Sequence, residues 1–270
     1  MDERTALLRH IADDPDDDLP RPVYADWLHE NGDEALAEFI RVDCELYRHT
    51  VGSDAPTLPR KQLKKLRGRR AALWNQHRSR WLPEANEQPW PGTVWVDVRR
   101  GLPSDLLVQD GAAFQASFSA VELPGVYRAY SVALSHTYLG PKAVRGLAES
   151  PHFACLEGLS LSFQGVGDSG LTALARSPHL ARLSSLLLAG NSVGDQGARA
   201  LAESSHLTRL RALDLSNNRI GDDGAEALAA SANLADLGWL ELRGNEGITA
   251  SGQRVLREQF QGRVRLGSWW

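Results

Sequence analysis

Leucines recur at a constant interval of 27 residues through the second half of the chain. The motif Leu-x-x-Leu-x-Leu begins at Leu156, Leu183, Leu210 and Leu237. This alternation predicts a short strand whose leucines all face one side. A helical pattern follows the strand, as at residues 198–203 and 225–230. Each 27-residue unit therefore predicts one strand and one helix.

A polar turn separates each strand from its helix. An amide residue comes first, at Gln164, Asn191, Asn218 and Asn245, and a Gly-Asp-x-Gly segment follows it in all but the last unit. We expect the amide to satisfy buried backbone groups, the glycines to permit a tight turn and the aspartate to cap a helix N-terminus. A weaker copy of the unit contains Val132 and Leu134, and a more degenerate one uses Leu106 and Val108 as its strand.

One strand and one helix cannot bury these leucines alone, so neighbouring units must stack into a curved solenoid. Over residues 103–262 the repeat resembles the leucine-rich repeat, and its Asn-x-Ile-Gly-Asp-x-Gly form resembles the ribonuclease-inhibitor-like subtype. The resemblance implies an α/β fold with short parallel strands on the concave face and helices on the convex face. It also implies that the concave face binds proteins.

The first 50 residues follow a helical pattern instead. Apolar residues recur at helical spacing in residues 2–12, 21–30 and 34–47, which prolines and an Asn-Gly pair separate. These segments predict a small, compact all-α module. Cys44 lies in the third segment, on the side expected to face the core.

Dense motifs run through this module: Leu7-Leu8, Ile11, Asp14-Pro15, Tyr24-Ala25-Asp26-Trp27-Leu28, Glu30, Gly32-Asp33, Glu38-Phe39-Ile40-Arg41 and Cys44-Glu45-Leu46. In this order they resemble the repeat-companion domain of planctomycete bacteria, which is named for accompanying leucine-rich repeats. The resemblance implies a bacterial source and an interaction protein, and it transfers no active site. We expect Asp26 and Arg41 to be polar anchors of the module, in a structural salt bridge more than in contact with a ligand.

Charge is distributed unevenly along the chain, although the net charge of the whole is only −4. Residues 1–50 carry 14 acidic and 5 basic side chains, whereas residues 60–80 contain 9 Lys or Arg and no acid. Apolar residues spaced by three and four predict an amphipathic helix over residues 60–81. Its basic side could pack on the acidic module, bind nucleic acid or lie on an anionic membrane surface. The candidate anion or nucleic-acid contacts are Lys64, Lys65, Arg69 and Arg70.

These patterns divide the chain into five parts. Residues 1–50 form the acidic helical module, and residues 51–92 contain a loop, the basic helix and a hinge rich in Pro and Trp. Residues 93–128 are expected to form an N-terminal capping hairpin and a degenerate repeat. The repeats of period 27 occupy residues 129–262, and residues 263–270 form a C-terminal cap.

The strand positions between the inward leucines are expected to face the concave surface. Most of them are small, so the first half of that face offers shape and little charge. The exception is a mixed aromatic and charged set, a composition typical of binding hot spots: Leu187, Asp214, Trp239, Glu241 and Arg243. A rival interpretation is that Trp239 packs beneath the C-terminal cap with Trp269 and Trp270.

Regularly repeated polar residues give little support for a metal or catalytic site. His152, His179 and His206 are spaced 27 apart, which places them in a line along the stacked units and not in a tetrahedral cage. The acidic run 13–18 is best explained by a helix break followed by capping acids. The sequence also contains none of the common nucleophile, zinc-protease or dinucleotide-binding motifs. We therefore predict no catalytic residue, metal or cofactor.

Together, the repeat and the lack of catalytic motifs predict a non-enzymatic module or scaffold that binds a protein on its concave face. Alternatives are a nucleic-acid-binding adaptor that uses residues 60–80 and an enzyme-inhibitor-type repeat protein. Two cysteines and the lack of a long apolar segment or secretory leader favour the cytoplasm. The partner's identity and the oligomeric state stay open.

Overall fold

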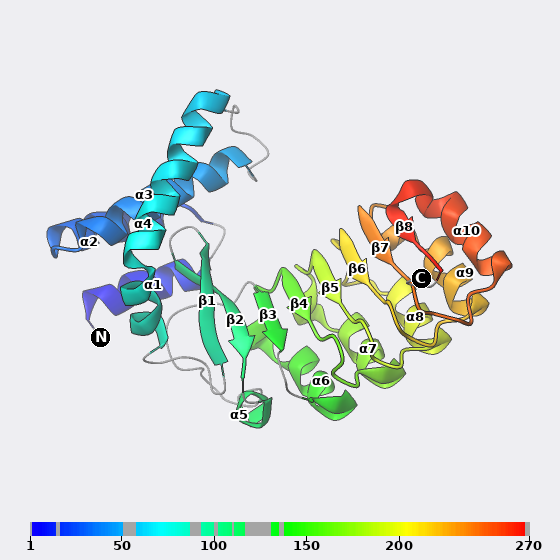
Figure 1. The fold of residues 1–270 in the computed structure, drawn as a ribbon. Helices are drawn as coiled ribbons and strands as arrows, with labels where there is room; N and C mark the ends of the chain where they lie inside the picture. The colour runs from blue at the N-terminus through cyan, green and yellow to red at the C-terminus, as the bar shows by residue number, and fades with distance from the viewer. Residues whose placement is uncertain are drawn as a thin grey trace. The chain divides into compact units, whose positions relative to one another are not determined.

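The computed structural model describes residues 2–14, 17–50, 58–86, 93–99, 102–109, 111–116, 131–134 and 138–267. The chain divides into two compact units. The first contains helices α1 to α4, and the second contains the elements from β3 to β8 (Figure 1). No helix among the described residues is long and apolar enough to cross a membrane.

The helices of the first unit are α1 (Glu3–Asp13), α2 (Pro20–Glu30), α3 (Glu34–Thr50) and α4 (Arg60–Asn86). Their starts have local causes. The Asp2 carboxylate accepts the N–H of Thr5 at 2.8 Å and caps α1, while Pro20 opens α2 at a position where no N–H is needed. The helical pattern predicted all four helices, although α3 and α4 run further than expected.

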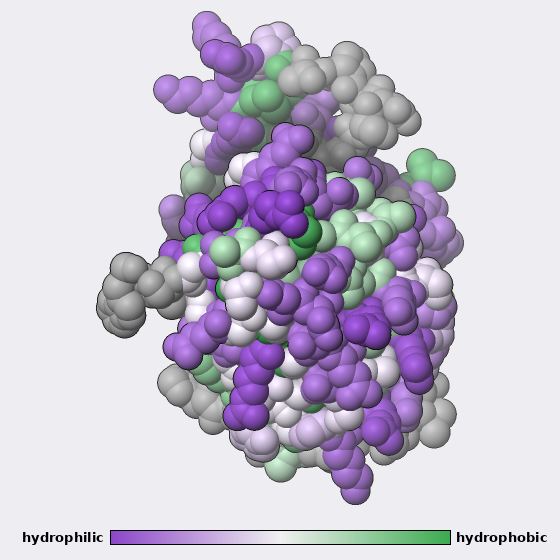
Figure 2. All heavy atoms as spheres, turned by 90° about the vertical axis from the view of Figure 1, so that its right-hand side faces the viewer, coloured by the Kyte–Doolittle hydropathy of each residue, from purple (hydrophilic) through white to green (hydrophobic). Residues whose placement is uncertain are grey.

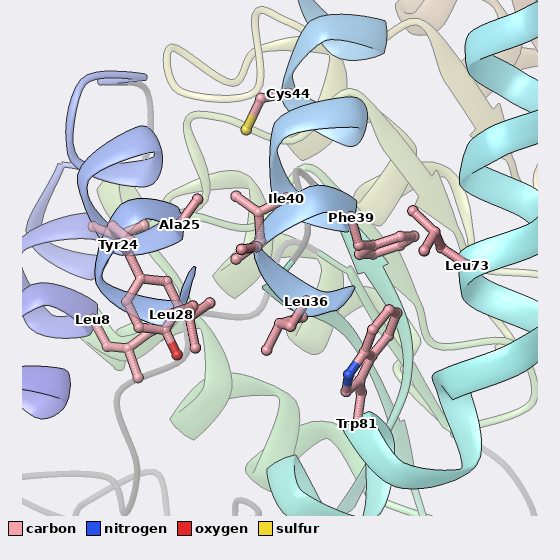
Figure 3. Packing of buried hydrophobic residues seen from close by; sticks show 12 residues of the cluster. Leu8, Tyr24, Ala25, Leu28, Leu36, Phe39, Ile40, Cys44, Leu73 and Trp81 are labelled. Atoms are coloured by element: carbon pink, nitrogen blue, oxygen red, sulfur yellow. The ribbon is translucent and has the colours of Figure 1, made fainter. Parts of the chain in front are cut away.

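The core of the first unit lies around α3. Phe39 lies beside Leu73 and Trp81 of α4, and its ring centroid is 4.9 Å from that of Trp81 (Figure 3). Tyr24 and Leu28 of α2 belong to the same buried cluster, as does Cys44. The apolar side of the basic helix therefore packs on α3, and the expectation that Cys44 faces the core is confirmed.

The second unit repeats one strand and one helix. Its strands are β3 (Ser131–Leu134), β4 (Gly158–Ser160), β5 (Ser185–Leu187), β6 (Ala212–Asp214), β7 (Trp239–Glu241) and β8 (Val264–Arg265). Its main helices are α6 (Gly140–Glu149), α7 (Gly167–Ala175), α8 (Asp195–Ala202), α9 (Asp222–Ala230) and α10 (Ala250–Phe260). Short 3-10 turns follow four of these helices: η2 (Pro151–Phe153), η3 (Pro178–Leu180), η4 (Ala232–Leu234) and η5 (Gln261–Arg263).

Strands β3 to β8 are parallel and pair in chain order. From β3 to β7 each residue lies beside the residue 27 positions later, so Leu159, Leu186, Leu213 and Leu240 form one buried row. The strands line one side of this unit and α6 to α10 cover the other (Figure 1). We call one strand with its following helix a coil.

The chain approaches this sheet through β1 (Thr93–Arg99), β2 (Leu102–Val108) and the short helix α5 (Gly111–Ala116). The order β1-β2-β3 continues the sheet, and Leu106 and Val108 are buried as the strand of a degenerate coil should be. At the other end, Val264 and Arg265 add a further parallel strand within the predicted C-terminal cap.

The asparagine that follows β5, β6 and β7 bonds to the coil before it. Oδ1 of Asn218 accepts the N–H groups of Asn191 and Val193, both at 3.0 Å, and Nδ2 donates to the carbonyl of Leu188 at 3.0 Å. Asn191 and Asn245 bond to their preceding coils in the same way. The prediction that these amides satisfy buried backbone groups is therefore confirmed.

The aspartate of each Gly-Asp-x-Gly turn reaches forward. Oδ1 of Asp195 accepts the N–H of Gly221 at 2.7 Å and that of Gly224 at 3.0 Å, which are the N-cap and first-turn groups of α9. Asp168 and Asp222 do the same for α8 and α10. The expected helix cap is present, but it caps the helix of the next coil.

This forward bond explains the second glycine of the turn. A Cβ added at Gly224 would lie 2.6 Å from Oδ1 of Asp195, and one at Gly252 would lie 2.3 Å from Oδ1 of Asp222. The backbone there is helical, so the glycine is needed for the close approach of a carboxylate from the neighbouring coil.

Candidate protein-interaction surface

Strand register brings the predicted concave residues together on β5, β6 and β7. Leu187, Asp214 and Glu241 lie directly beside one another in one row across the three strands. Trp239 lies two residues before Glu241, on the same face of β7, and Arg243 follows two residues after it. We call these five residues the β5–β7 patch.

Glu241 and Arg243 form a two-pronged ion pair within the patch. Nε of Arg243 donates to Oε1 of Glu241 at 2.7 Å, and Nη2 donates to Oε2 at 2.7 Å. The Glu241 side chain is only 2% exposed, whereas that of Arg243 is 23% exposed. Bonding to Glu241, together with the negative charges of Glu241 and Asp214, raises the pKa of Arg243 above its usual value. Glu241 therefore fixes the guanidinium that the surface presents.

The other patch residues are half-buried. Asp214 turns one carboxylate oxygen toward its own strand, where Oδ1 accepts the N–H of Ser216 at 2.8 Å. Leu187 and Trp239 add apolar area beside it. Trp269 and Trp270, the partners of Trp239 in the rival interpretation, lie outside the described residues.

The strand rows before the patch are small and uncharged, as expected from the sequence. The described positions are Ser131, Ala133, Gly158, Ser160, Ser162, Ser185 and Ala189. Sequence reasoning missed two exposed aromatic residues beside these rows, Tyr138 and Phe163. The available signal was that Phe163 occupies a position at which the next three coils have Gly190, Asn217 and Gly244.

Comparison with known families bears on the same unit. Residues 181–202 and 206–229 match a family model described as Leucine Rich repeat. The second unit is a leucine-rich-repeat solenoid. Leucine-rich repeats generally mediate protein–protein interaction and are typically non-enzymatic. No curated protein sequence matches the chain significantly.

Ahead of the leucine-rich repeats, three arginines of the basic helix α4 pair with carboxylates of α3 or of Asp33, the residue before it. Arg69 bonds to both carboxylate oxygens of Glu38 at 2.6 and 2.5 Å. Arg70 pairs with Asp43, and Arg80 pairs with Asp33. The bonds from Arg69 lower the pKa of Glu38, and those to Glu38 raise the pKa of Arg69.

The four candidate anion contacts thus differ in their ion pairing. Arg69 and Arg70 are engaged by carboxylates of the same unit, whereas Lys64 and Lys65 are exposed. Binding of an anion at all four positions would require Arg69 and Arg70 to leave Glu38 and Asp43. The geometry therefore favours packing as the role of the two arginines.

Two of the remaining polar candidates form structural contacts, Arg41 with Asp26 and Asn233 with the preceding coil. Nη2 of Arg41 donates to Oδ1 of Asp26 at 2.6 Å, which is the salt bridge expected between these two anchors. In the row of His152, His179 and His206, the fourth member Asn233 donates to the carbonyl of Ser204 in the preceding coil. No cluster of three or more metal-binding side chains occurs in the part of the chain that the structure describes.

Proposed function

We propose that this protein is a non-enzymatic interaction module that binds a protein partner on the concave face of its leucine-rich repeats. The observation that carries the proposal is the β5–β7 patch, in which strand register places Leu187, Asp214 and Glu241 side by side and Glu241 pairs with Arg243. The general association of leucine-rich repeats with protein binding supports it.

The patch is suited to a partner that offers apolar area and charges of both signs. Leu187 and Trp239 supply the apolar contacts, while Arg243 presents a positive group beside the negative Asp214. Glu241 is too buried to be a main contact, and its role in this proposal is to hold Arg243 in position. A rigid arginine loses little conformational entropy on binding, which favours its use as an anchor.

The proposal extends to the rest of the chain. The solenoid is of the ribonuclease-inhibitor-like subtype, and residues 1–50 are a repeat-companion module of bacterial origin, working in the cytoplasm. The three pairs of Arg69, Arg70 and Arg80 support treating α4 as part of this module. The module would then position the repeats and leave ligand binding to them.

The test is site-specific photo-crosslinking followed by mutation. A benzoylphenylalanine placed at Leu187 should crosslink one protein in an extract of the source cells, whereas the same group at Glu226, exposed on α9 of the convex side, should not. The triple variant Asp214→Ala, Trp239→Ala and Arg243→Ala should abolish the crosslink while circular dichroism shows a folded chain. Equal crosslinking at Glu226, or full retention by the folded triple variant, would overturn the proposal.

The nucleic-acid alternative has its own measurement. Retention on DNA or RNA that falls steeply with salt and is reduced by Lys64→Ala with Lys65→Ala would replace a protein partner with a nucleic acid. We expect little retention at moderate salt, because the three paired arginines already have carboxylate partners.

A further inference from the structure

Large apolar side chains are rarely exposed in the described part of this chain. Four stand out, as two pairs: Leu19 with Val23 in the first unit, and Tyr138 with Phe163 on consecutive coils of the second. On the face drawn in Figure 2, hydrophilic residues dominate and apolar ones occur in small patches. Tyr138 is 73% exposed and Phe163 is 66% exposed, so burial does not account for either aromatic ring.

The backbone makes Phe163 the more unusual of the two. Its φ of +61° is left-handed, a conformation that a bulky side chain rarely adopts. The next coils have the same conformation at this position, with φ of 66° at Gly190, 53° at Asn217 and 74° at Gly244. Glycine and asparagine adopt it at little cost, whereas for phenylalanine it is unfavourable.

Hydrogen bonds between neighbouring coils hold this conformation in the described part of the solenoid. The N–H of Phe163 donates to the carbonyl of Ala189 at 2.8 Å, and Gly190 and Asn217 donate to the next coil in the same way. Phe163 therefore has an unfavourable backbone conformation, and its side chain is largely exposed to water. Unfavourable backbone geometry that burial does not offset is a mark of a functional position.

Each ring lies close to a glycine of the following coil. A Cβ added at Gly190 would lie 2.4 Å from Cδ1 of Phe163, and one at Gly165 would lie 2.3 Å from the hydroxyl oxygen of Tyr138. A partner that covers these exposed rings removes their apolar area from water, which favours binding.

The surroundings limit what these rings can bind. The described concave positions of β3, β4 and β5 carry no charged side chain, and Ser162 and Ala189 connect them to Phe163. A charged ligand would lose hydration here without gaining an opposite charge. An uncharged chain can bury its apolar groups on the rings and bond its backbone to the serine hydroxyls.

We propose that Tyr138 and Phe163 anchor an uncharged, apolar segment of a partner protein along the small-residue half of the solenoid. The anchor rests on the proposed protein-binding function and adds a second contact beyond the β5–β7 patch. It uses different residues, so the two can fail separately.

The first test is Phe163→Asn, because asparagine occupies the equivalent position two coils later, at Asn217. Removing strain should leave the urea midpoint of unfolding unchanged or raise it, whereas a structural role for the ring would lower it. A lowered midpoint overturns the proposal.

Binding is measured with peptides selected on the full chain from a phage-displayed library of random 12-residue sequences. We expect the selected peptides to be uncharged and apolar, and Phe163→Asn or Tyr138→Ser to weaken them at least tenfold by fluorescence anisotropy. Asn217→Gly, two coils further on, should change affinity less than twofold. Failure to enrich any peptide, charged consensus sequences, or equal affinity for Phe163→Asn would overturn the anchor.

Two further results separate the alternatives. If sedimentation shows a dimer that Phe163→Asn dissociates, the occupant is a second copy of this chain and the proposal is wrong. If the triple β5–β7 variant retains the selected peptides, the anchor stands without the patch. Loss of these peptides in both sets of variants supports one continuous concave site.

Discussion

The asparagines at positions 191, 218 and 245 each bond to several backbone groups of the solenoid, and Asn218 is the clearest case. Asn218 is 7% exposed, and its amide also donates to the carbonyls of Leu215 at 2.9 Å and Ser216 at 3.0 Å. These groups lie between the end of the strand and the start of the helix, where hydrogen bonds between coils satisfy only some of the backbone. The side chain replaces a missing stretch of secondary structure.

We predict that Asn218→Ala lowers the free energy of unfolding by about 3 kcal/mol, because several buried backbone groups lose their partners at once. Urea unfolding followed by circular dichroism measures the change. Arg219→Ala is the matched control, since it alters the adjacent exposed side chain and should shift stability by less than about 0.5 kcal/mol. Similar losses in the two variants would contradict this role for the asparagine.

At the scale of elements, helices α8, α9 and α10 each depend on a carboxylate from the coil before. Asp222 is bound by the hydroxyl and N–H of Thr249 and by the N–H of Gly252. The Thr249 hydroxyl bond, assisted by the two N–H groups, lowers the pKa of Asp222 below its usual value of 3.8. Negative charge at a helix N-terminus is also favourable in itself.

A lowered carboxyl pKa fixes the direction of the pH effect. The cap on α10 contributes its full stability above the unfolded pKa of 3.8, and this contribution is lost as pH falls through the lower folded pKa. We predict that Asp222→Asn is less stable than the native chain at neutral pH, and that the difference shrinks as pH falls from about 5 toward 2. Urea midpoints across this range measure it.

Asp223 provides the control for this prediction. It is exposed, adjacent to Asp222 and also in the first turn of α9. Asp223→Asn should leave the pH dependence nearly unchanged. A difference between Asp222→Asn and the native chain that is constant with pH would mean that the titration of Asp222 does not act through the cap.

The sequence predicted these elements well because their causes are periodic or local. A repeat of 27 residues specifies the buried leucines, and proline or asparagine-glycine breaks separate α1, α2 and α3. It did not reveal that Asp195 caps the following helix, since a bond between coils leaves no local signal. The pairing of Arg70 with Asp43 and the exposure of Phe163 likewise depend on tertiary contacts that no periodicity encodes.

The β5–β7 patch was predictable for the same reason as the strands. Once the repeat is known, positions 27 apart become neighbours, which places Leu187, Asp214 and Glu241 side by side. Burial within the patch was not predictable, because the 2% exposure of Glu241 follows from its pairing with Arg243. Position along the sheet is a matter of register, whereas exposure depends on side-chain packing.

At the scale of the molecule, the coils of the second unit are equivalent, and each contacts mainly its neighbours. The stability of such an array is approximately the sum of contributions from single coils and from the interfaces between neighbours. We predict that deleting residues 186–212, one full period, leaves a chain that folds cooperatively at a lower urea midpoint. Ser185 then precedes Leu213, and Asp168 reaches Gly221 and Gly224 as it now reaches Gly194 and Gly197. Circular dichroism and urea unfolding measure the outcome.

Deletion of residues 186–211 is the control. It removes one residue fewer, so Ala212 takes the place of a buried strand leucine and the inward row is broken. This variant should lose cooperative unfolding. If both deletions behave alike, the coils are not interchangeable.

The aspartates bond only to the coil that follows them, so the two ends of the array are not equivalent. Asp168, Asp195 and Asp222 each offer a carboxylate to a successor, but in the last full coil Ala250 stands where that aspartate would be. Duplication of an internal coil would copy both the aspartate and the glycine whose N–H it accepts. The array can therefore gain coils at internal positions. A helix added after α10 would have no carboxylate from Ala250 to cap its N-terminus. Ala250 therefore disfavours extension of the solenoid at this end.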